Sequence, residues 1–150
     1  MNAKMIFYSM ALIALSTALS AQTSTNTLPD QPKLKSAIYD WEKMQPTTVS
    51  NGVRRLVFDG PTTTLDKINC HITTLNPGQQ SGEPRLHVQE EVVVVKEDTV
   101  EAMYDGHSET VGPGSVIFFA SGATTRLRNP GKVPCTYTVI YYYTTLTPKK

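Results

Sequence analysis

Three side chains between residues 84 and 91 could act together in chemistry: Arg85, His87 and Glu91. All three are odd-numbered, so in an extended strand they leave the backbone on the same face. An imidazole and a carboxylate on one face can help to hold a divalent transition metal. A guanidinium cannot do so, because it is permanently cationic and has no lone pair to donate. The spacing therefore predicts a metal-binding strand in which a cation has replaced one ligand.

The rest of the chain indicates which elements position this group. Short runs rich in β-branched and aromatic residues alternate with turn residues such as Asn76-Pro77-Gly78 and Asp105-Gly106. No amphipathic helix of useful length is visible, and residues 36–45, which include Trp41, suit either a single helical turn or an irregular segment. Many short strands at this spacing predict an all-β sandwich or barrel. The strands that we expect are 54–59, 65–75, 86–96, 99–104, 116–120, 125–128 and 136–145.

Two spaced sets of residues surround the chemical group. They are Gly78, Arg85, His87, Glu91 and Asp98, followed by Gly114, Ala120, Gly122, Thr125 and Asn129. Together the two sets resemble the two motifs of the cupin family. The resemblance runs from about residue 36 to residue 143 and implies a double-stranded β-helix (cupin jelly-roll) barrel. We therefore expect residues 36–147 to form one cupin domain.

The first set departs from the cupin motif at one ligand. Gly78 matches the turn glycine, His87 matches the second histidine and Glu91 matches the glutamate. Arg85 stands where the first histidine belongs, and Asp98 occupies the place of the closing glycine. Two of the three metal ligands of this motif are therefore retained, His87 and Glu91.

The second set departs at its ligand as well. Gly114, Gly122 and Asn129 match the motif, whereas Ala120 replaces a proline and Thr125 replaces the last histidine. The cavity of the implied barrel then receives a short hydroxyl in place of an imidazole.

The resemblance implies a degenerate metal site. Cupins hold iron, manganese, zinc or nickel with three histidines and the glutamate, and a tight centre usually needs at least three protein ligands. Only His87 and Glu91 remain, and Arg85 adds a repulsion of several kcal/mol if a cation sits ~4 Å away at an effective dielectric constant of about 20. We expect no tightly bound cofactor, the alternative being a residual site for a divalent transition metal at His87 and Glu91.

Two interpretations of Arg85 remain open. In the structural one, Arg85 pairs with Glu91 and fills the space that the metal left. In the functional one, Arg85 and His87 bind an anionic or hydroxylated small molecule, because a guanidinium suits carboxylate and phosphate. Thr125 could hydrogen-bond the same molecule, which makes Arg85, His87, Glu91 and Thr125 the candidate ligand-binding residues. His87 and Glu91 are the candidate catalytic pair, since a neighbouring carboxylate can set the tautomer of the imidazole.

Three functions follow from this group of residues. The first is a metal-free binding protein for a small carbohydrate or organic acid. The second is an enzyme, such as an isomerase, lyase or oxidoreductase, that acts on a sugar or a sugar acid. The third is a structural barrel that pairs with a second copy through edge strands as a homodimer. The chain shows no Gly-x-Ser-x-Gly elbow and no glycine-rich phosphate cradle, which argues against a hydrolase triad and nucleotide binding.

The amino-terminal residues and the charge indicate the compartment and the class of partner. Lys4 precedes an apolar run that ends in small residues before Ala21-Gln22, the pattern of a cleaved signal peptide over residues 1–21. Residues 22–35 are expected to form a linker or a frayed arm. We therefore expect a periplasmic or secreted protein with no membrane span after cleavage. With 14 basic and 13 acidic residues, the chain lacks the basic footprint of a nucleic-acid binder.

Five side chains outside the central group have a predicted environment. Cys70 and Cys135 each lie near the start of a predicted strand. If those two strands pair antiparallel, the sulfurs are separated beyond the Cα spacing of about 4.4–6.8 Å that a disulfide needs. We therefore expect two buried free thiols. His71 could face either the cavity or solvent, and Arg126 and Arg128 are expected to form a solvated face.

Overall fold

The structure, a computed structural model, describes residues 31–149. The predicted signal peptide (1–21) and residues 22–30 of the predicted arm lie outside the described residues. Residues 31–35 have no regular secondary structure, but the Leu34 backbone N–H donates to the Pro61 carbonyl at 2.8 Å. This end of the arm is therefore attached to the domain that follows it.

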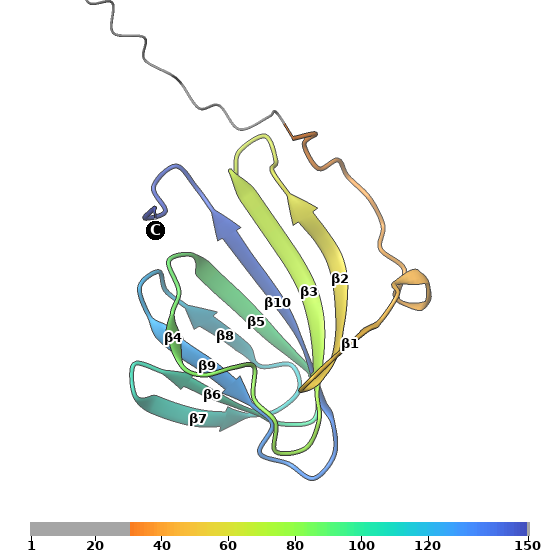
Figure 1. Cartoon of the computed structure of the whole chain (residues 1–150), viewed down its shortest axis with the longest axis vertical. Coiled ribbons are helices and arrows are strands. Elements are labelled where there is room, and N and C mark those ends of the chain that lie inside the picture. Colours follow the sequence, from red (N-terminus) through yellow and green to blue (C-terminus); the bar gives the residue numbers. More distant parts are fainter. Residues whose placement is uncertain (1–30, 150) are drawn as a thin grey trace, which may run out of the picture. The chain divides into compact units, whose positions relative to one another are not determined.

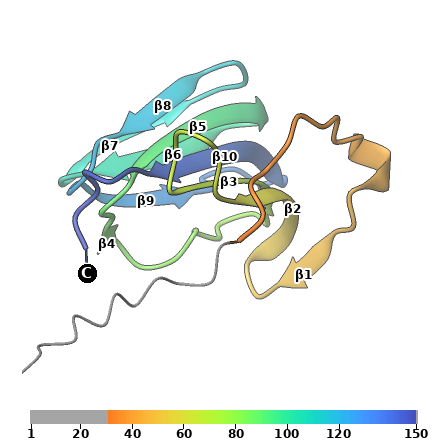
Figure 2. The same cartoon turned by 90° about the horizontal axis from the view of Figure 1, so that it is seen from above.

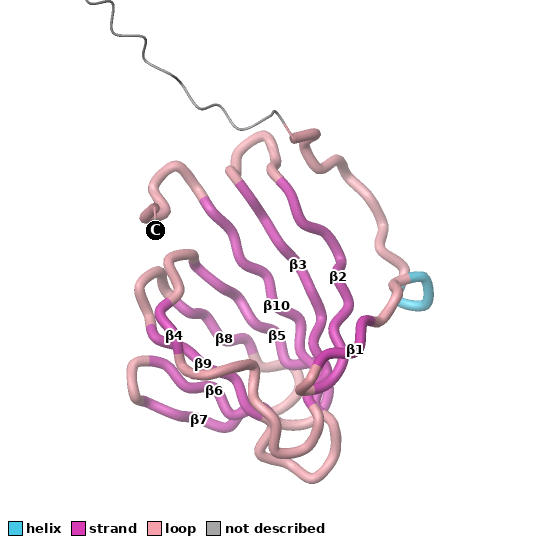
Figure 3. Tube along the Cα trace, in the orientation of Figure 1, coloured by secondary structure: helices cyan, strands magenta, loops and turns pink. Residues whose placement is uncertain are grey.

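Between residues 31 and 149 the chain forms ten β-strands and one turn of 3-10 helix (Figure 3). No helix in that part of the chain is both long and apolar enough to cross a membrane. The elements are η1 (Trp41–Lys43), β1 (Thr47–Val49), β2 (Gly52–Gly60), β3 (Lys67–Leu75), β4 (Arg85–Leu86), β5 (Glu90–Glu97), β6 (Val100–Tyr104), β7 (His107–Val111), β8 (Val116–Phe119), β9 (Thr124–Arg128) and β10 (Cys135–Tyr143).

The strands form two antiparallel sheets whose order differs from the order of the sequence. The larger sheet has the order β1-β2-β3-β10-β5-β8 and the smaller one has the order β4-β9-β6-β7 (Figure 1). The last strand, β10, lies between β3 and β5, and β9 lies between β4 and β6. This interleaving of early and late strands is that of a jelly roll, and the predicted all-β jelly-roll fold is confirmed.

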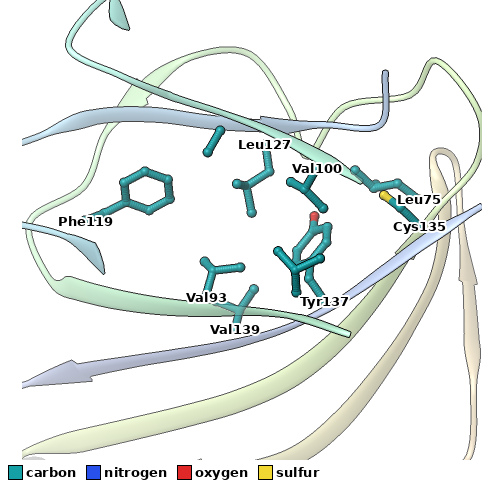
Figure 4. Close-up of a cluster of buried hydrophobic side chains, with 10 residues drawn as sticks. Leu75, Val93, Val100, Phe119, Leu127, Cys135, Tyr137 and Val139 are labelled. Atoms are coloured by element: carbon teal, nitrogen blue, oxygen red, sulfur yellow. The ribbon is translucent and has the colours of Figure 1, made fainter. Parts of the chain in front are cut away.

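The core lies between the two sheets. Along β5 the side chains alternate between buried and half-buried positions, as expected for a strand with one face on a core. In Figure 4, Val93 and Val139 of the larger sheet lie opposite Leu127 of the smaller one. Burying each such side chain contributes about 1.5–3 kcal/mol. The fully buried side chains include Leu75, Val93, Val95, Val100, Phe119, Cys135 and Tyr137.

The connection between β5 and β6 explains the replacement of the closing motif glycine by Asp98. Asp98 adopts a φ of 56°, in the left-handed region that favours glycine. Aspartate is one of the few other residues that tolerate this region, because its short side chain bonds the local backbone. Here the Asp98 carboxylate accepts from the Thr99 backbone N–H at 2.7 Å.

The segment before β1 runs beside β2, as Figures 1 and 2 both show. Asp40 caps its single helical turn by accepting from the Glu42 backbone N–H at 3.1 Å. The Trp41 ring contacts two cations, the Arg55 guanidinium at 4.4 Å and the Lys96 ammonium at 3.8 Å from its centroid. Of the two structures expected for residues 36–45, the helical turn is the one that forms, with Trp41 as its anchor.

Candidate functional site

A cavity of about 540 Å³ lies between the sheets and contains the residues selected from the sequence. Its size falls within the range of about 300–1,000 Å³ that is usual for small-molecule sites. Leu127, Tyr137 and Val139 form an apolar part of the lining. Arg85, His87, Glu91 and Thr125 also line it, so all four candidate ligand-binding residues converge on one space.

The backbone around His87 is held by the turn that carries the second motif. The His87 N–H donates to the Ala123 carbonyl at 3.1 Å, and the His87 carbonyl accepts from the Gly122 N–H at 2.7 Å. Gly122 has a φ of 85°, a conformation that a side chain would strain. The Ser121 hydroxyl donates to the Val88 carbonyl at 2.7 Å. The two motifs are therefore joined physically, because one of them fixes the position of the histidine of the other.

The prediction of one continuous strand through residues 86–96 is wrong. β4 ends at Leu86 and belongs to the smaller sheet, whereas β5 begins at Glu90 and belongs to the larger sheet. His87 lies in the crossing between them and not on a strand. Arg85 and Glu91 thus reach the cavity from opposite walls, and His87 reaches it from the connection.

The side chains form a chain of contacts centred on His87. Arg85 Nε donates to His87 Nε2 at 3.1 Å, and His87 Nδ1 lies 3.6 Å from Glu91 Oε2. The Gln89 amide lies 2.9 Å from His87 Nδ1, and its other end contacts the Tyr143 hydroxyl at 3.3 Å. The imidazole is thereby held between a cation on one nitrogen and a carboxylate and an amide on the other.

The direct ion pair of Arg85 with Glu91, expected in the structural interpretation, does not form among residues 31–149. His87 lies between the two charged groups instead. The guanidinium still acts on the carboxylate through space, because its charge opposes the rise in the pKa of Glu91.

Glu91 is the most perturbed carboxyl group of the site. Only 8% of the residue is exposed, and this burial raises its pKa from 4.5 to about 7, with Arg85 opposing the rise. Burial has this effect because it penalises the charged form of a carboxyl group. Near neutral pH the Glu91 carboxyl group can therefore both give and take a proton, which suits a general acid or base.

Thr125 occupies the position expected from the second motif. It is a buried residue of β9, directly opposite Arg85 of β4 in the antiparallel register. Cross-strand partners share a face of the sheet, so both side chains are directed at the cavity. The hydroxyl adds a short hydrogen-bonding group beside the guanidinium.

His71, which the sequence left undecided, lines the cavity. Its Nδ1 lies 2.8 Å from Oδ1 of the buried Asn69. Burial, aided by the charge of Arg54, lowers the pKa of His71 to about 4. The ring therefore stays neutral at physiological pH.

Several lining residues were missed by sequence reasoning. Gln89 is odd-numbered like the selected residues and is buried beside His87, so the same parity pattern could have identified it. Arg54 enters from β2, where it lies opposite Thr73 in β3, and no sequence motif marks it. Tyr141 and Tyr143 form an aromatic part of the wall with their rings 6.0 Å apart in an edge-to-face arrangement.

The environment predicted for Arg126 and Arg128 is wrong. Both side chains are half-buried and share one carboxylate, with Arg126 3.2 Å and Arg128 3.5 Å from Glu101 oxygens. Glu101 lies directly opposite Arg128 in the β6–β9 register, so pairing of the strands creates this cluster. Both arginines are therefore paired with Glu101 within the smaller sheet, and their side chains do not form a solvated face.

The environment predicted for the two cysteines is confirmed. Cys70 and Cys135 are buried free thiols. In the β3–β10 register Cys135 lies opposite Leu75 and Cys70 lies opposite Ile140, so five residues separate the thiols along the ladder. That distance is about 17 Å.

The residues of the cavity do not fit a tightly held divalent metal. The Nε2 lone pair of His87 already accepts from the Arg85 guanidinium, so a metal at this atom would have to displace a cation. Thr125 offers only a neutral hydroxyl where the motif has an imidazole. Between residues 31 and 149 no set of three or more histidine, cysteine, aspartate or glutamate side chains converges as metal ligands would. Whether the protein binds a metal remains a prediction.

A family model for the cupin domain matches residues 71–141. An RmlC-like cupin from Shewanella frigidimarina has a TM-score of 0.61 at 13% identity, over 75% of this chain and 95% of that chain. KdgF from a Halomonas species has a TM-score of 0.60 at 13% identity, over 71% and 94% of the two chains. A cupin-superfamily sugar phosphate isomerase from Silicibacter pomeroyi has a TM-score of 0.57 at 19% identity, over 72% and 76%.

No curated protein matches the chain. The low identities to the solved structures show a common fold and leave the activity open. The interleaved sheets, the two residue motifs and the family match agree with one another. The chain contains a cupin domain and has the fold of the cupin superfamily.

Proposed function

We propose that this cupin domain binds a small organic acid, including sugar acids, without a tightly bound metal. The observation that carries the proposal is the position of Arg85, whose exposed guanidinium lines the cavity and contacts the imidazole of His87. A guanidinium presents parallel N–H groups that match a carboxylate in two hydrogen bonds. An acid is therefore the ligand class that this residue recognises best.

The rest of the lining supports a hydroxylated acid of modest size. Thr125 and Gln89 offer neutral hydrogen-bonding groups, and Tyr141 and Tyr143 offer aromatic surface of the kind that stacks on sugar rings. A cavity of about 540 Å³ accommodates a monosaccharide or a comparable organic acid. The similarity to a sugar phosphate isomerase is compatible with a carbohydrate ligand but concerns that protein alone.

Thermal unfolding in the presence of a ligand panel tests this proposal. The panel contains uronic acids, neutral sugars and simple carboxylates, and the protein carries no histidine tag. We expect acids to raise the midpoint and neutral sugars to have little effect. Arg85→Met should abolish the rise, whereas Lys132→Met, which removes a cation from an exposed residue, should retain it. A broad panel without any stabilising acid would exclude the binding function.

A second function is favoured by one observation, the contact of His87 with a carboxyl group whose pKa is about 7. A carboxyl group with a pKa near neutral pH, in contact with an imidazole, suits an isomerase or a lyase that moves a proton beside a carboxylate. Incubation of panel acids in D₂O tests this function. Deuterium incorporation that requires Glu91 would establish an enzyme, and its absence for every bound acid would favour a binding protein.

Self-association and export are separate proposals. Val116 and Phe118 are 67% and 59% exposed on β8, the edge strand of the larger sheet, which favours pairing with a second copy there. Sedimentation equilibrium tests this self-association, and a monomer at all concentrations would refute it.

The proposal of export rests on residues 1–21 of the sequence. Amino-terminal sequencing of the exported protein should begin at Gln22 or Ala21, and retention of Met1 would refute cleavage.

A further inference from the structure

The cavity contains a second arginine, Arg54, to which the proposed function assigns no role. Arg54 lies in β2 opposite Thr73 of β3, and Thr73 in turn lies opposite Tyr137 of β10. All three residues line the cavity, so this row of cross-strand neighbours places the Arg54 side chain on the cavity face of the larger sheet. Because β2 is two strands away from β10, the backbones of Arg54 and Tyr137 are about 10 Å apart.

Arg54 and Arg85 occupy different parts of the cavity. Arg85 enters from β4 of the smaller sheet, and β2 and β4 lie on opposite sides of β10 (Figures 1 and 2). Burial lowers the pKa of His71 to about 4, and the charge of Arg54 contributes to this decrease. The charge of Arg85 acts instead on Glu91, where it opposes the rise in pKa that burial causes. Each guanidinium therefore has its own neighbours within one cavity.

Neither guanidinium is neutralised by a carboxylate of the protein. Between residues 31 and 149, no carboxylate oxygen lies within salt-bridge distance of Arg54 or Arg85. Two acids line the cavity. Glu83 is exposed and accepts from the Gln80 amide at 2.9 Å, and the Glu91 pKa of about 7 leaves that group partly protonated at neutral pH. A ligand with one carboxylate pairs with Arg85 and leaves Arg54 without an anionic partner.

A second carboxylate on the ligand would complement the second guanidinium. Each planar guanidinium can bind one carboxylate through two charge-assisted hydrogen bonds. We propose that the cavity takes acids with a carboxylate at each end, one bound by Arg85 and the other by Arg54. This inference rests on the proposed function and narrows it from organic acids to dicarboxylic acids. In a sugar diacid, the hydroxyls between the two ends can bond the neutral groups of Thr125 and Gln89.

Matched pairs of sugar acids test the role of the second carboxylate. Calorimetric titration compares tartrate, xylarate and glucarate with threonate, xylonate and gluconate, in which a CH₂OH group replaces one carboxylate. The three pairs increase in length, so they sample different separations of the two anionic ends. We expect at least one diacid to bind at least about tenfold more tightly than its partner. Equal affinity within all three pairs would overturn the inference.

Substitutions at neighbouring positions of β2 show whether Arg54 causes this preference. Arg54→Met should remove the preference for the diacid, and Arg54→Lys should retain part of it because the positive charge remains. Arg55→Met is the matched control, since Arg55 is the next residue of β2 and contacts the Trp41 ring. This variant should keep the full preference. A preference that survives Arg54→Met would overturn the inference.

The ring signals of His71 report whether the second carboxylate reaches Arg54. In ¹H–¹³C spectra, with His71→Gln to identify the signals, the preferred diacid should move them more than its one-carboxylate partner does. A diacid that binds more tightly without moving these signals would overturn the inference. If both members of every pair bind equally and Arg85→Met abolishes their binding, the proposed function stands and this inference fails. If no acid binds at all, the proposed function fails and this inference fails with it.

Discussion

Replacement of Glu91 by glutamine should change how the stability of the protein depends on pH. The folded state keeps the Glu91 proton up to a pKa of about 7, whereas the unfolded chain releases it near 4.5. Between these values the folded state binds the extra proton, so the free energy of unfolding falls as the pH rises and becomes constant above about 7. The raised pKa of Glu91 corresponds to a total decrease of about 3 kcal/mol in the free energy of unfolding.

Glutamine has nearly the same shape as glutamate and does not titrate, so the variant escapes this loss. The free energy of unfolding of Glu91→Gln minus that of the wild type should therefore rise by about 3 kcal/mol from below pH 4.5 to above pH 7. Urea unfolding at a series of pH values measures this difference. His71 contributes a slope of the opposite sign, because its pKa is lowered to about 4 and stability falls as it is protonated. His71 is present in both proteins, so its contribution cancels in the difference between their free energies of unfolding.

Glu90→Gln is the matched control for this experiment. Glu90 and Glu91 are adjacent in β5 and lie opposite Tyr142 and Tyr141 respectively, so their side chains occupy different faces of the sheet. The rise with pH in the free energy of unfolding, relative to the wild type, comes from the buried carboxyl group only if Glu91→Gln shows this rise and Glu90→Gln does not. A difference between Glu91→Gln and wild type that stays constant with pH, or falls as the pH rises, would refute the burial argument for Glu91.

Three further predictions concern the motifs and the core. Arg85→His combined with Thr125→His should restore metal uptake, measured by elemental analysis; a folded double variant without metal would show that the motif correspondence is wrong. Burial raises the pKa of both Cys70 and Cys135, so a thiol reagent should react slowly with native protein and rapidly after unfolding, and immediate native reaction would contradict the structure. Asn129 is fully buried and makes three hydrogen bonds to backbone groups, so Asn129→Ala should lower the free energy of unfolding in urea by at least about 2 kcal/mol. A decrease well below that value would mean that water replaces these bonds.

The fold could be predicted from the sequence because its strands and turns carry local signals. Alternation along β5 and the dense β-branched and aromatic residues of β10 indicate strands whatever their neighbours. The motif positions at Gly122 and Asp98 require left-handed backbone, and the residues found there tolerate it. β7 was not anticipated, because its exposed polar residues carry no core-facing pattern and depend on pairing with β6.

The crossing between β4 and β5 could not be predicted. Every second residue from Arg85 to Glu91 faces the cavity, as in a continuous strand, but tertiary contacts to the turn at Gly122 divide it between two sheets. The odd-numbered spacing thus identified residues that line the cavity, although the backbone is not the continuous strand that it predicted. The spacing does not indicate which charged groups touch, because this depends on the distance between the sheets.

Charge pairing across strands was also invisible in the sequence. Arg126 and Arg128 look like a solvated face when β9 is considered alone, and only the register with β6 brings Glu101 between them. The same limit applies to Arg54, whose place in the cavity follows from the β2–β3 register.

Calorimetric titration of the tightest panel acid after treatment with a strong chelator tests the central claim most directly. We predict that the wild type binds equally well before and after metal removal, and that Arg85→Met lowers the affinity at least about tenfold (~1.4 kcal/mol). Binding that disappears with the chelator and returns with iron, manganese, nickel or zinc, or that is unchanged in Arg85→Met, would contradict it.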